Sequence, residues 1–228
     1  MKKLTNKQKS ALELSIIILF ALIAIFFWDT LFIYPIKLFA VLMHEFSHGI
    51  ATILTGGRIA SIEINAHLGG QCLSNGGNIY AIAFAGYLGS MFWGALLFYS
   101  SYNYKAGIWI TTFIAIMILI FAILYVNGTF GILSASAFAV LLFISPTLLN
   151  RILNYYFMKF LGLICCLYVI VDIKEDLITL TYRETDAQLL ANLTNFPSIF
   201  WGILWLVISV TILYFLLKYS YKKGLTKS

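Results

Sequence analysis

Two histidines and a glutamate lie within five residues of one another in an otherwise apolar stretch, "VLMHEFSHGI" (residues 41–50). His44, Glu45 and His48 form the pattern H-E-x-x-H. Residues four apart lie on one face of a helix about one turn apart, so both imidazoles can bind a single metal ion. The glutamate beside the first histidine can then reach a water on that ion. This spacing is typical of a hydrolytic zinc site, where the metal lowers the pKa of its bound water toward ~7 and a carboxylate takes the proton.

Chance is a weak explanation for this spacing, because the whole chain has only 3 histidines. An ionisable group at the centre of a membrane also costs about 2.5 to 3.5 kcal/mol on the insertion scale, so three such groups in one segment need a compensating partner. We therefore interpret His44 and His48 as metal ligands, Glu45 as a general base and Zn²⁺ as the expected cofactor.

A catalytic zinc usually takes three protein ligands and keeps a fourth position for water. Asp172, in "LYVIVDIKEDLI", is the preferred third ligand, because a carboxylate at the end of an apolar segment needs a partner. Asp176 lies four residues further on the same helical face and could bind the metal instead, or orient the site. His67 lies in a Gly-rich interval and is expected at the surface. Thr185 and Asp186 precede "AQLLANL" and are expected to cap a short helix, without a role in catalysis.

The composition indicates an integral membrane protein, since 61% of the residues are hydrophobic and 11% are charged, against roughly 25% charged residues in ordinary soluble domains. Seven apolar segments approach the length needed to cross a hydrocarbon core of about 30 Å: 11–28, 37–55, 79–100, 107–126, 129–149, 155–173 and 197–217. The prediction is an all-α polytopic membrane protein with six to seven transmembrane helices. It forms a single membrane-embedded domain over residues 1–228, in contact with the lipid bilayer.

The net charge of +6 comes mostly from two basic tails, residues 1–10 and 218–228. Such tails are typical of anchors beside anionic lipid, and they do not indicate nucleic-acid binding. A cytoplasmic N-terminus agrees with the positive-inside rule for the loops that carry Arg58 and Arg183. It also places the candidate site on the cytoplasmic side, which we expect to be that of a bacterial plasma membrane. Seven crossings, however, put the basic C-terminal tail outside, so either one segment is re-entrant or the count is one too high.

Shorter patterns predict local features between and within these segments. The Gly-rich interval from Gly56 to Asn78 predicts a short β-hairpin, and its strand at Ile62–Ile64 either pairs with an extended substrate by edge addition or only connects two helices. Small residues four apart predict a close helix–helix contact: Gly86, Ser90 and Gly94. The cysteines form no C-x-x-C motif and indicate neither a disulfide framework nor a sulfur-ligated metal: Cys72, Cys165 and Cys166.

Several of these stretches resemble one protein family. "HEFSHGIATILTGGRIASIEI", followed by "LGGQC" and "AFAGYLGSMFWGALL", resembles the M50B-like branch of the site-2 protease (M50) family of intramembrane zinc metalloproteases. "YVIVDIKEDLI" and "ETDAQLLANLTNFPSIFWGILW" are similar to the downstream blocks of that branch. The resemblance implies a polytopic peptidase in which His44 and His48 bind zinc, Glu45 is the general base, and an aspartate from a later span completes the site. The N-P-D-G and L-D-G motifs of better-known members are absent, so the role is carried to Asp172 on the pattern of the M50B-like branch.

The expected function is therefore that of a zinc metalloendopeptidase that hydrolyses peptide bonds in transmembrane or membrane-proximal protein substrates. A catalytically inactive membrane scaffold or binding protein that retains the metal site is the alternative. A transporter is a third hypothesis, and the lack of internal repeats counts against it.

Overall fold

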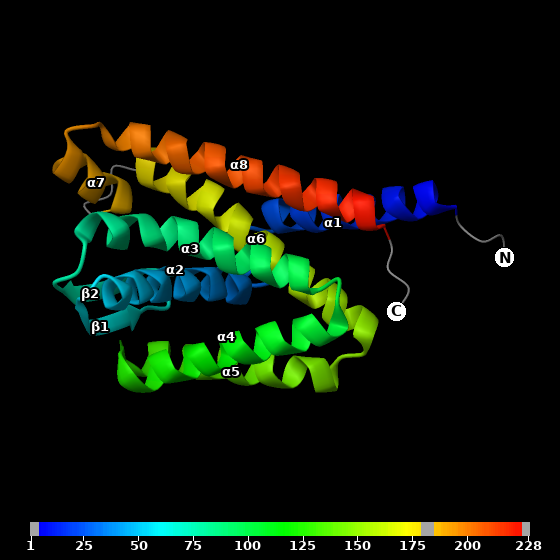
Figure 1. Ribbon diagram of the computed structural model, residues 1–228, viewed down its shortest axis with the longest axis horizontal. Coiled ribbons are helices and arrows are strands. Elements are labelled where there is room, and N and C mark those ends of the chain that lie inside the picture. Colours follow the sequence, from blue (N-terminus) through cyan, green and yellow to red (C-terminus); the bar gives the residue numbers. More distant parts are fainter. Residues whose placement is uncertain (1–4, 179–184, 225–228) are drawn as a thin grey trace.

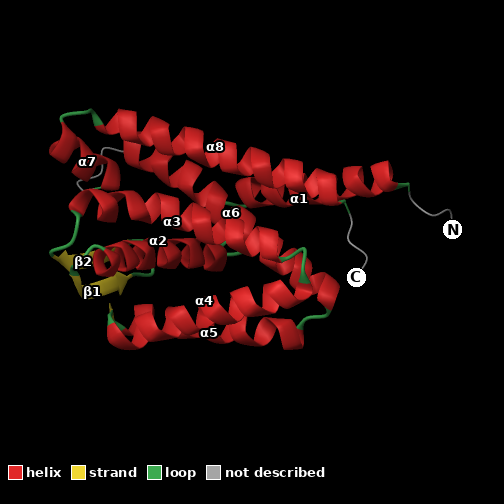
Figure 2. Ribbon diagram, viewed as in Figure 1, coloured by secondary structure: helices red, strands yellow, loops and turns green. Residues whose placement is uncertain are grey.

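The computed structural model describes residues 5–178 and 185–224, with no side chains described for residues 175–178. Its helices are α1 (Asn6–Phe26), α2 (Tyr34–Leu54), α3 (Ile79–Ser100), α4 (Tyr104–Leu124), α5 (Thr129–Leu148), α6 (Arg151–Ile178), α7 (Asp186–Thr194) and α8 (Ser198–Lys223) (Figure 1). Its strands are β1 (Arg58–Ile64), β2 (Gly70–Asn75) and β3 (Val126–Asn127) (Figure 2). Among these described helices, six are long and apolar enough to cross a membrane: α1, α3, α4, α5, α6 and α8. The prediction of an all-α polytopic membrane protein is confirmed.

Local capping residues explain where several helices begin. The Asn78 side chain accepts a hydrogen bond from the backbone N–H of Ala81 at the start of α3, and Asn103 accepts from two N–H groups at the start of α4. Thr185 caps α7 as predicted, and Pro35 occupies the first turn of α2, where its missing N–H costs least. These signals are local, so helix ends within a few residues of the observed ones could be read from the sequence.

The predicted hairpin is confirmed and forms part of a three-stranded sheet of order β2-β1-β3. β1 pairs antiparallel with β2, and it also pairs parallel with β3, which lies in the short connection between α4 and α5. β1 is thus the central strand. The hypothesis of substrate addition at Ile62–Ile64 is therefore wrong, because β2 pairs with all of this stretch and β3 already occupies the other edge at Ile62 and Glu63.

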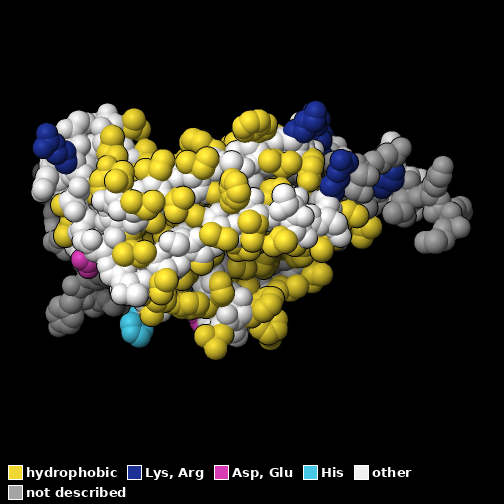
Figure 3. All heavy atoms as spheres, turned by 90° about the horizontal axis from the view of Figure 1, so that it is seen from below, with side chains coloured by type: hydrophobic (Ala, Val, Ile, Leu, Met, Phe, Trp, Pro, Cys, Tyr) yellow, Lys and Arg dark blue, Asp and Glu magenta, His cyan; other side chains and the backbone are white. Residues whose placement is uncertain are grey.

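The small-residue pattern of α3 produces a close contact with α6. A Cβ atom added at Gly94 would lie 2.6 Å from the carbonyl oxygen of Gly162 in α6. The two backbones can approach this closely only because both positions lack a side chain, as the spacing predicts. The outer surface is different: Figure 3 shows mainly hydrophobic side chains over the middle of one face, with Lys and Arg toward the two ends.

The directions of the helices place the described parts of the two basic tails at the same end of the molecule. α1 and α2 run in the same direction along the long axis, so together they advance from one end of the molecule to the other (Figure 1). The start of α1 meets the end of α8, since a Cβ at Gly224 would lie 3.1 Å from the Ser10 Oγ. Tyr102, which follows α3, donates a hydrogen bond to Ser220 Oγ of α8 at 2.7 Å. The outer ends of α1 and α8 therefore lie together, and the sheet and α7 lie at the opposite end.

Candidate metal centre

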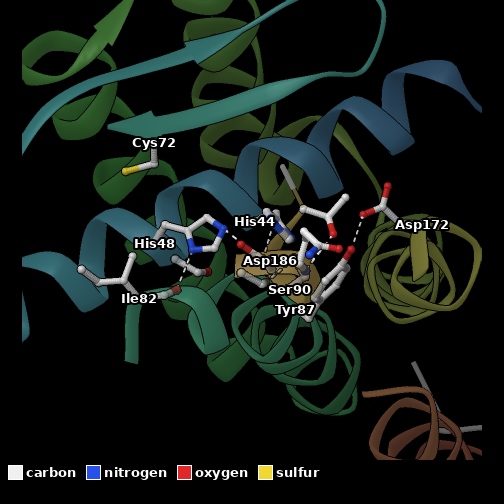
Figure 4. A network of polar contacts seen from close by, with 12 residues as sticks. His44, His48, Cys72, Ile82, Tyr87, Ser90, Asp172 and Asp186 are labelled. Atoms are coloured by element: carbon white, nitrogen blue, oxygen red, sulfur yellow. Dashed lines mark hydrogen bonds and ion pairs between the residues drawn. The ribbon is translucent and has the colours of Figure 1, made fainter. Parts of the chain in front are cut away.

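Three side chains from two distant parts of the chain converge at the sheet end of the molecule. His44 and His48 lie on one face of α2, and Asp186 is the first residue of α7. The Nε2 atoms of His44 and His48 are each 3.3 Å from Asp186 Oδ2. One nitrogen from each histidine and one carboxylate oxygen all lie within 4.8 Å of one another, and Figure 4 shows the three groups facing a common point.

Neighbouring groups orient both imidazole rings. His48 Nδ1 lies 2.7 Å from the carbonyl oxygen of Ile82 in α3. A ring that donates from Nδ1 to a carbonyl leaves Nε2 as the metal-binding atom. The His44 ring packs edge-on against Tyr87, with ring centroids 4.9 Å apart and planes at 80°. The helical spacing of the motif and the packing of α3 on α2 thus together aim both Nε2 atoms at Asp186.

Gly86 of α3 creates the space in front of these nitrogens. A Cβ added at Gly86 would lie 2.5 Å from Nε2 of both His44 and His48. Any larger residue would therefore occupy the position toward which the two rings point. The sequence predicts Gly86 only as part of a packing surface, and its place beside the histidines becomes visible only in the structure.

The donor set and its surroundings fit a metal ion. Two imidazole nitrogens and one carboxylate are a common ligand set of catalytic zinc sites. Among the described residues, His44 Nδ1 and Asp186 Oδ2 are buried and have no hydrogen-bond partner. Burial by itself would raise the pKa of the Asp186 carboxyl, but the attraction of the two histidines beside it, above all His48, holds that pKa well below its ordinary value. A divalent cation between the deprotonated imidazoles would supply the same compensating positive charge.

Glu45 shares a cavity with this group. The cavity has a volume of about 220 Å³. Its walls include Gly70–Cys72 of β2 together with His44, Glu45, His48 and Asp186. The Glu45 side chain is buried and lies against β2, where a Cβ at Gly70 would be 2.5 Å from Glu45 Cγ. A carboxylate beside the candidate metal position therefore faces the same cavity.

Asp172 lines this cavity but is not part of the converging group. Its carboxylate accepts hydrogen bonds from the hydroxyls of Tyr87 and Tyr168, each at 3.0 Å, as seen for Tyr87 in Figure 4. The structure thus brings Asp186, rather than the expected Asp172, to the two histidines. The side chain of Asp176 lies outside the described part of the chain, and His67 is exposed, as expected.

Asp186 was not predicted as a metal ligand, because the start of a helix fully explains the residues around it. Thr185 does cap α7, and Asp186 does occupy its first turn, where a carboxylate is favoured by the helix dipole. The expectation that Asp186 only supports the helix is corrected by its position beside the histidines. The signal that could have revealed it was the block "ETDAQLLANL", which carries the family resemblance.

Fold and site together define a polytopic membrane protein with a candidate metal centre built from His44, His48 and Asp186. The chain matches the family model described as Peptidase M50B-like over residues 17–216, and it therefore belongs to the M50B-like peptidase family. A search of curated proteins and a search of solved structures each returned no match.

Proposed function

We propose that this protein is an intramembrane zinc metalloendopeptidase, with His44, His48 and Asp186 as metal ligands and Glu45 as the general base. The observation that carries the proposal is the convergence of two Nε2 atoms and one carboxylate oxygen beside Gly86, in a cavity that also contains Glu45. Membership of the M50B-like peptidase family supports the same reaction class.

The chemistry divides between the ion and the protein. A zinc ion held by His44, His48 and Asp186 would act as a Lewis acid and would lower the pKa of a water molecule to about 7. Glu45 follows His44 directly in α2, and its carboxylate takes a proton from the attacking water and later delivers it to the leaving amine. The enclosed position of Glu45 limits its exchange with bulk water, so the proton stays available for the second step.

The position of Glu45 supports an unwound substrate. In an intact helix each peptide carbonyl is hydrogen-bonded within the helix and lies inside a cylinder of side chains about 10–12 Å across. A substrate helix must therefore open locally before one of its peptide bonds can reach the buried Glu45 carboxylate. Irregular backbone of this kind is tolerated at membrane depth only where protein or a polar cavity shields it from lipid.

Matched carboxylate-to-amide substitutions test this assignment. Zinc content is measured on purified protein by mass spectrometry, and cleavage is measured on a synthetic transmembrane peptide that contains a helix-weakening Gly-Asn pair. We expect Glu45→Gln to keep zinc and to lose cleavage. Asp186→Asn should lower zinc affinity by at least about 100-fold, because loss of a group that only supports a ligand already costs about 10- to 100-fold. Asp172→Asn makes the same chemical change in the same cavity and should retain zinc.

Three outcomes would change the conclusion. A Glu45→Gln protein that still cleaves would refute the general-base role. Zinc loss in Asp172→Asn with zinc retained in Asp186→Asn would reverse the ligand assignment. Zinc bound without cleavage of any peptide would support the alternative of an inactive binding protein that retains its metal site.

We also propose that the metal centre faces away from the cytoplasm, because the end with the outer ends of α1 and α8 carries most of the described positive charge. The opposite, sheet end carries Arg58 and Lys174. The expectations of a cytoplasmic N-terminus and a cytoplasmic site are incompatible with this arrangement, which puts the two at opposite ends. The Lys and Arg residues at the α1/α8 end are Lys7, Lys9, Lys105, Arg151, Lys218, Lys222 and Lys223.

Labelling of intact bacterial host cells with a membrane-impermeant maleimide tests this orientation. In a background without native cysteines, Asn75→Cys at the exposed end of β2 should react from outside the cell, and Lys222→Cys near the end of α8 should react only after lysis. The reverse labelling pattern would place the metal centre on the cytoplasmic side.

A further inference from the structure

A second, open cavity lies beside the sheet and meets the metal cavity at β2. It has a volume of about 660 Å³. The two cavities share Gly70 and Gln71 as lining residues, so one strand separates them. We call the second cavity the flank groove and define it by its polar side chains: Glu63, Asn65, His67, Gln71 and Asn127.

The register of the sheet orders three of these side chains into a row. Glu63 of β1 pairs with Gln71 of β2 on one side and with Asn127 of β3 on the other. Directly paired residues project to the same face of a sheet, and all three are exposed. The neighbouring residue Ile62 points to the opposite face and is fully buried. The row crosses two strand spacings, about 9.5 Å in all, and leads away from the metal cavity.

The lining of the flank groove carries a negative charge and no Lys or Arg to balance it. Glu63 is the one carboxylate among its lining residues. The remaining polar groups are three amides and the imidazole of His67. An ionised side chain that faces hydrocarbon is costly, so this face needs water or a polar ligand rather than acyl chains. The Asn65 side-chain oxygen already accepts hydrogen bonds from the backbone N–H groups of His67 and Gly69. The amides of Gln71 and Asn127, which can both donate and accept, suit a peptide backbone, and Glu63 suits a cation beside it.

We propose that the flank groove binds the polar flank of the substrate next to the cleaved bond and selects Lys or Arg there. The inference rests on the proposed function, because it takes the metal cavity as the place of cleavage. Glu63 lies one strand, about 4.8 Å, beyond Gln71, and an extended peptide rises about 3.3 Å per residue. A basic residue about two positions from the part of the substrate that occupies the metal cavity therefore reaches Glu63.

A charge-swap experiment on purified protein tests the selection. Two synthetic peptides share an apolar segment of about 20 residues and a Gly-Asn pair, and their polar flanks carry either two lysines or two glutamates. We expect wild-type protein to cleave the lysine peptide with a kcat/KM about tenfold higher. Glu63→Lys should abolish or reverse this ratio, and Glu63→Gln should reduce it.

A matched control separates a local effect from a general change in charge. Asp29 is a carboxylate whose side chain is 90% exposed and which lies outside the groove. Asp29→Lys changes the net charge by the same amount as Glu63→Lys, so it should leave the preference at its wild-type value. A loss of preference in Asp29→Lys equal to that in Glu63→Lys would refute the assignment of selectivity to the flank groove.

Binding measurements distinguish failure of this inference from failure of the proposed function. Fluorescence anisotropy of the two labelled peptides is measured on the Glu45→Gln protein, with and without Glu63→Lys. Cleavage of both peptides at equal rates, unchanged by Glu63→Lys, would refute the flank groove and leave the peptidase function intact. A lysine preference in binding that Glu63→Lys removes, in a wild-type protein that cleaves neither peptide, would support the groove and refute the peptidase function.

Discussion

Replacement of Gly86 by alanine tests the metal centre without changing the identity of any ligand residue. The added Cβ would lie 2.5 Å from Nε2 of both His44 and His48, whereas real Cβ atoms essentially never come closer than 3.0 Å to another atom. Each imidazole must therefore retreat by about 0.5 Å, which exceeds the roughly 0.2 Å tolerance of zinc–ligand distances. Because two of three ligands are displaced, we expect zinc affinity to fall by at least about 100-fold, or about 2.8 kcal/mol.

The fold should survive this change. Alanine is favoured over glycine inside a helix by up to about 1 kcal/mol, and the rings can turn into the cavity of about 220 Å³ beside them. Gly107→Ala in α4 is the matched control. Its nearest neighbour would be Met158 Sδ at 3.2 Å, a flexible side chain that can shift.

The assay is competition of purified protein against a fluorescent zinc chelator, with thermal unfolding measured in parallel. Gly107→Ala should bind zinc like the wild type, and Gly86→Ala should remain folded while binding much more weakly. A folded Gly86→Ala protein with wild-type zinc affinity would show that the ion does not lie between the two Nε2 atoms, and the reasoning from Gly86 would fail.

Two further predictions concern the rest of the molecule. Lys159 and Glu13 form an ion pair whose side chains are both 0% exposed, and α1 has few other buried residues. Lys159→Met alone should therefore lower the free energy of unfolding by about 3 kcal/mol, and adding Glu13→Gln should recover part of that loss; additive losses in thermal unfolding would contradict the pairing. Burial, reinforced by the negative charge of Glu45, raises the pKa of the Cys72 thiol to about 12, although a hydrogen bond with Ser74 opposes the shift. Because the thiol stays protonated well above neutral pH, maleimide should label it at pH 8 at least tenfold more slowly in folded than in unfolded protein, in a background with the other cysteines replaced; equal rates would contradict this.

The helices and the motif could be predicted because their signals are local. Apolar runs of membrane-spanning length, prolines near segment ends and capping residues such as Thr185 act within a few residues of the element they define. The H-E-x-x-H spacing is also local, since it requires only that one helix form around His44 and His48. Both therefore appear in the structure close to where the sequence places them.

The hairpin shows the limit of such signals. Alternation around Ile62 predicts a strand, but it cannot say which strand will pair with it. The parallel pairing with Val126 and Asn127 depends on how α4 and α5 bring their connection back to β1. The central position of β1 and the row of polar side chains across the sheet follow from that pairing.

The sequence by itself determined the membrane class, the approximate helices and the two histidines with their neighbouring glutamate, because each depends on composition or on spacing within one segment. Only the tertiary structure decided which aspartate meets the histidines. Asp172 ends an apolar segment and Asp186 opens a short helix, and no local pattern distinguishes a ligand from a carboxylate at a helix exit or a helix start. The packing of α7 and α3 brings Asp186 and Gly86 to α2, while the hydroxyls of Tyr87 and Tyr168 hold Asp172 aside.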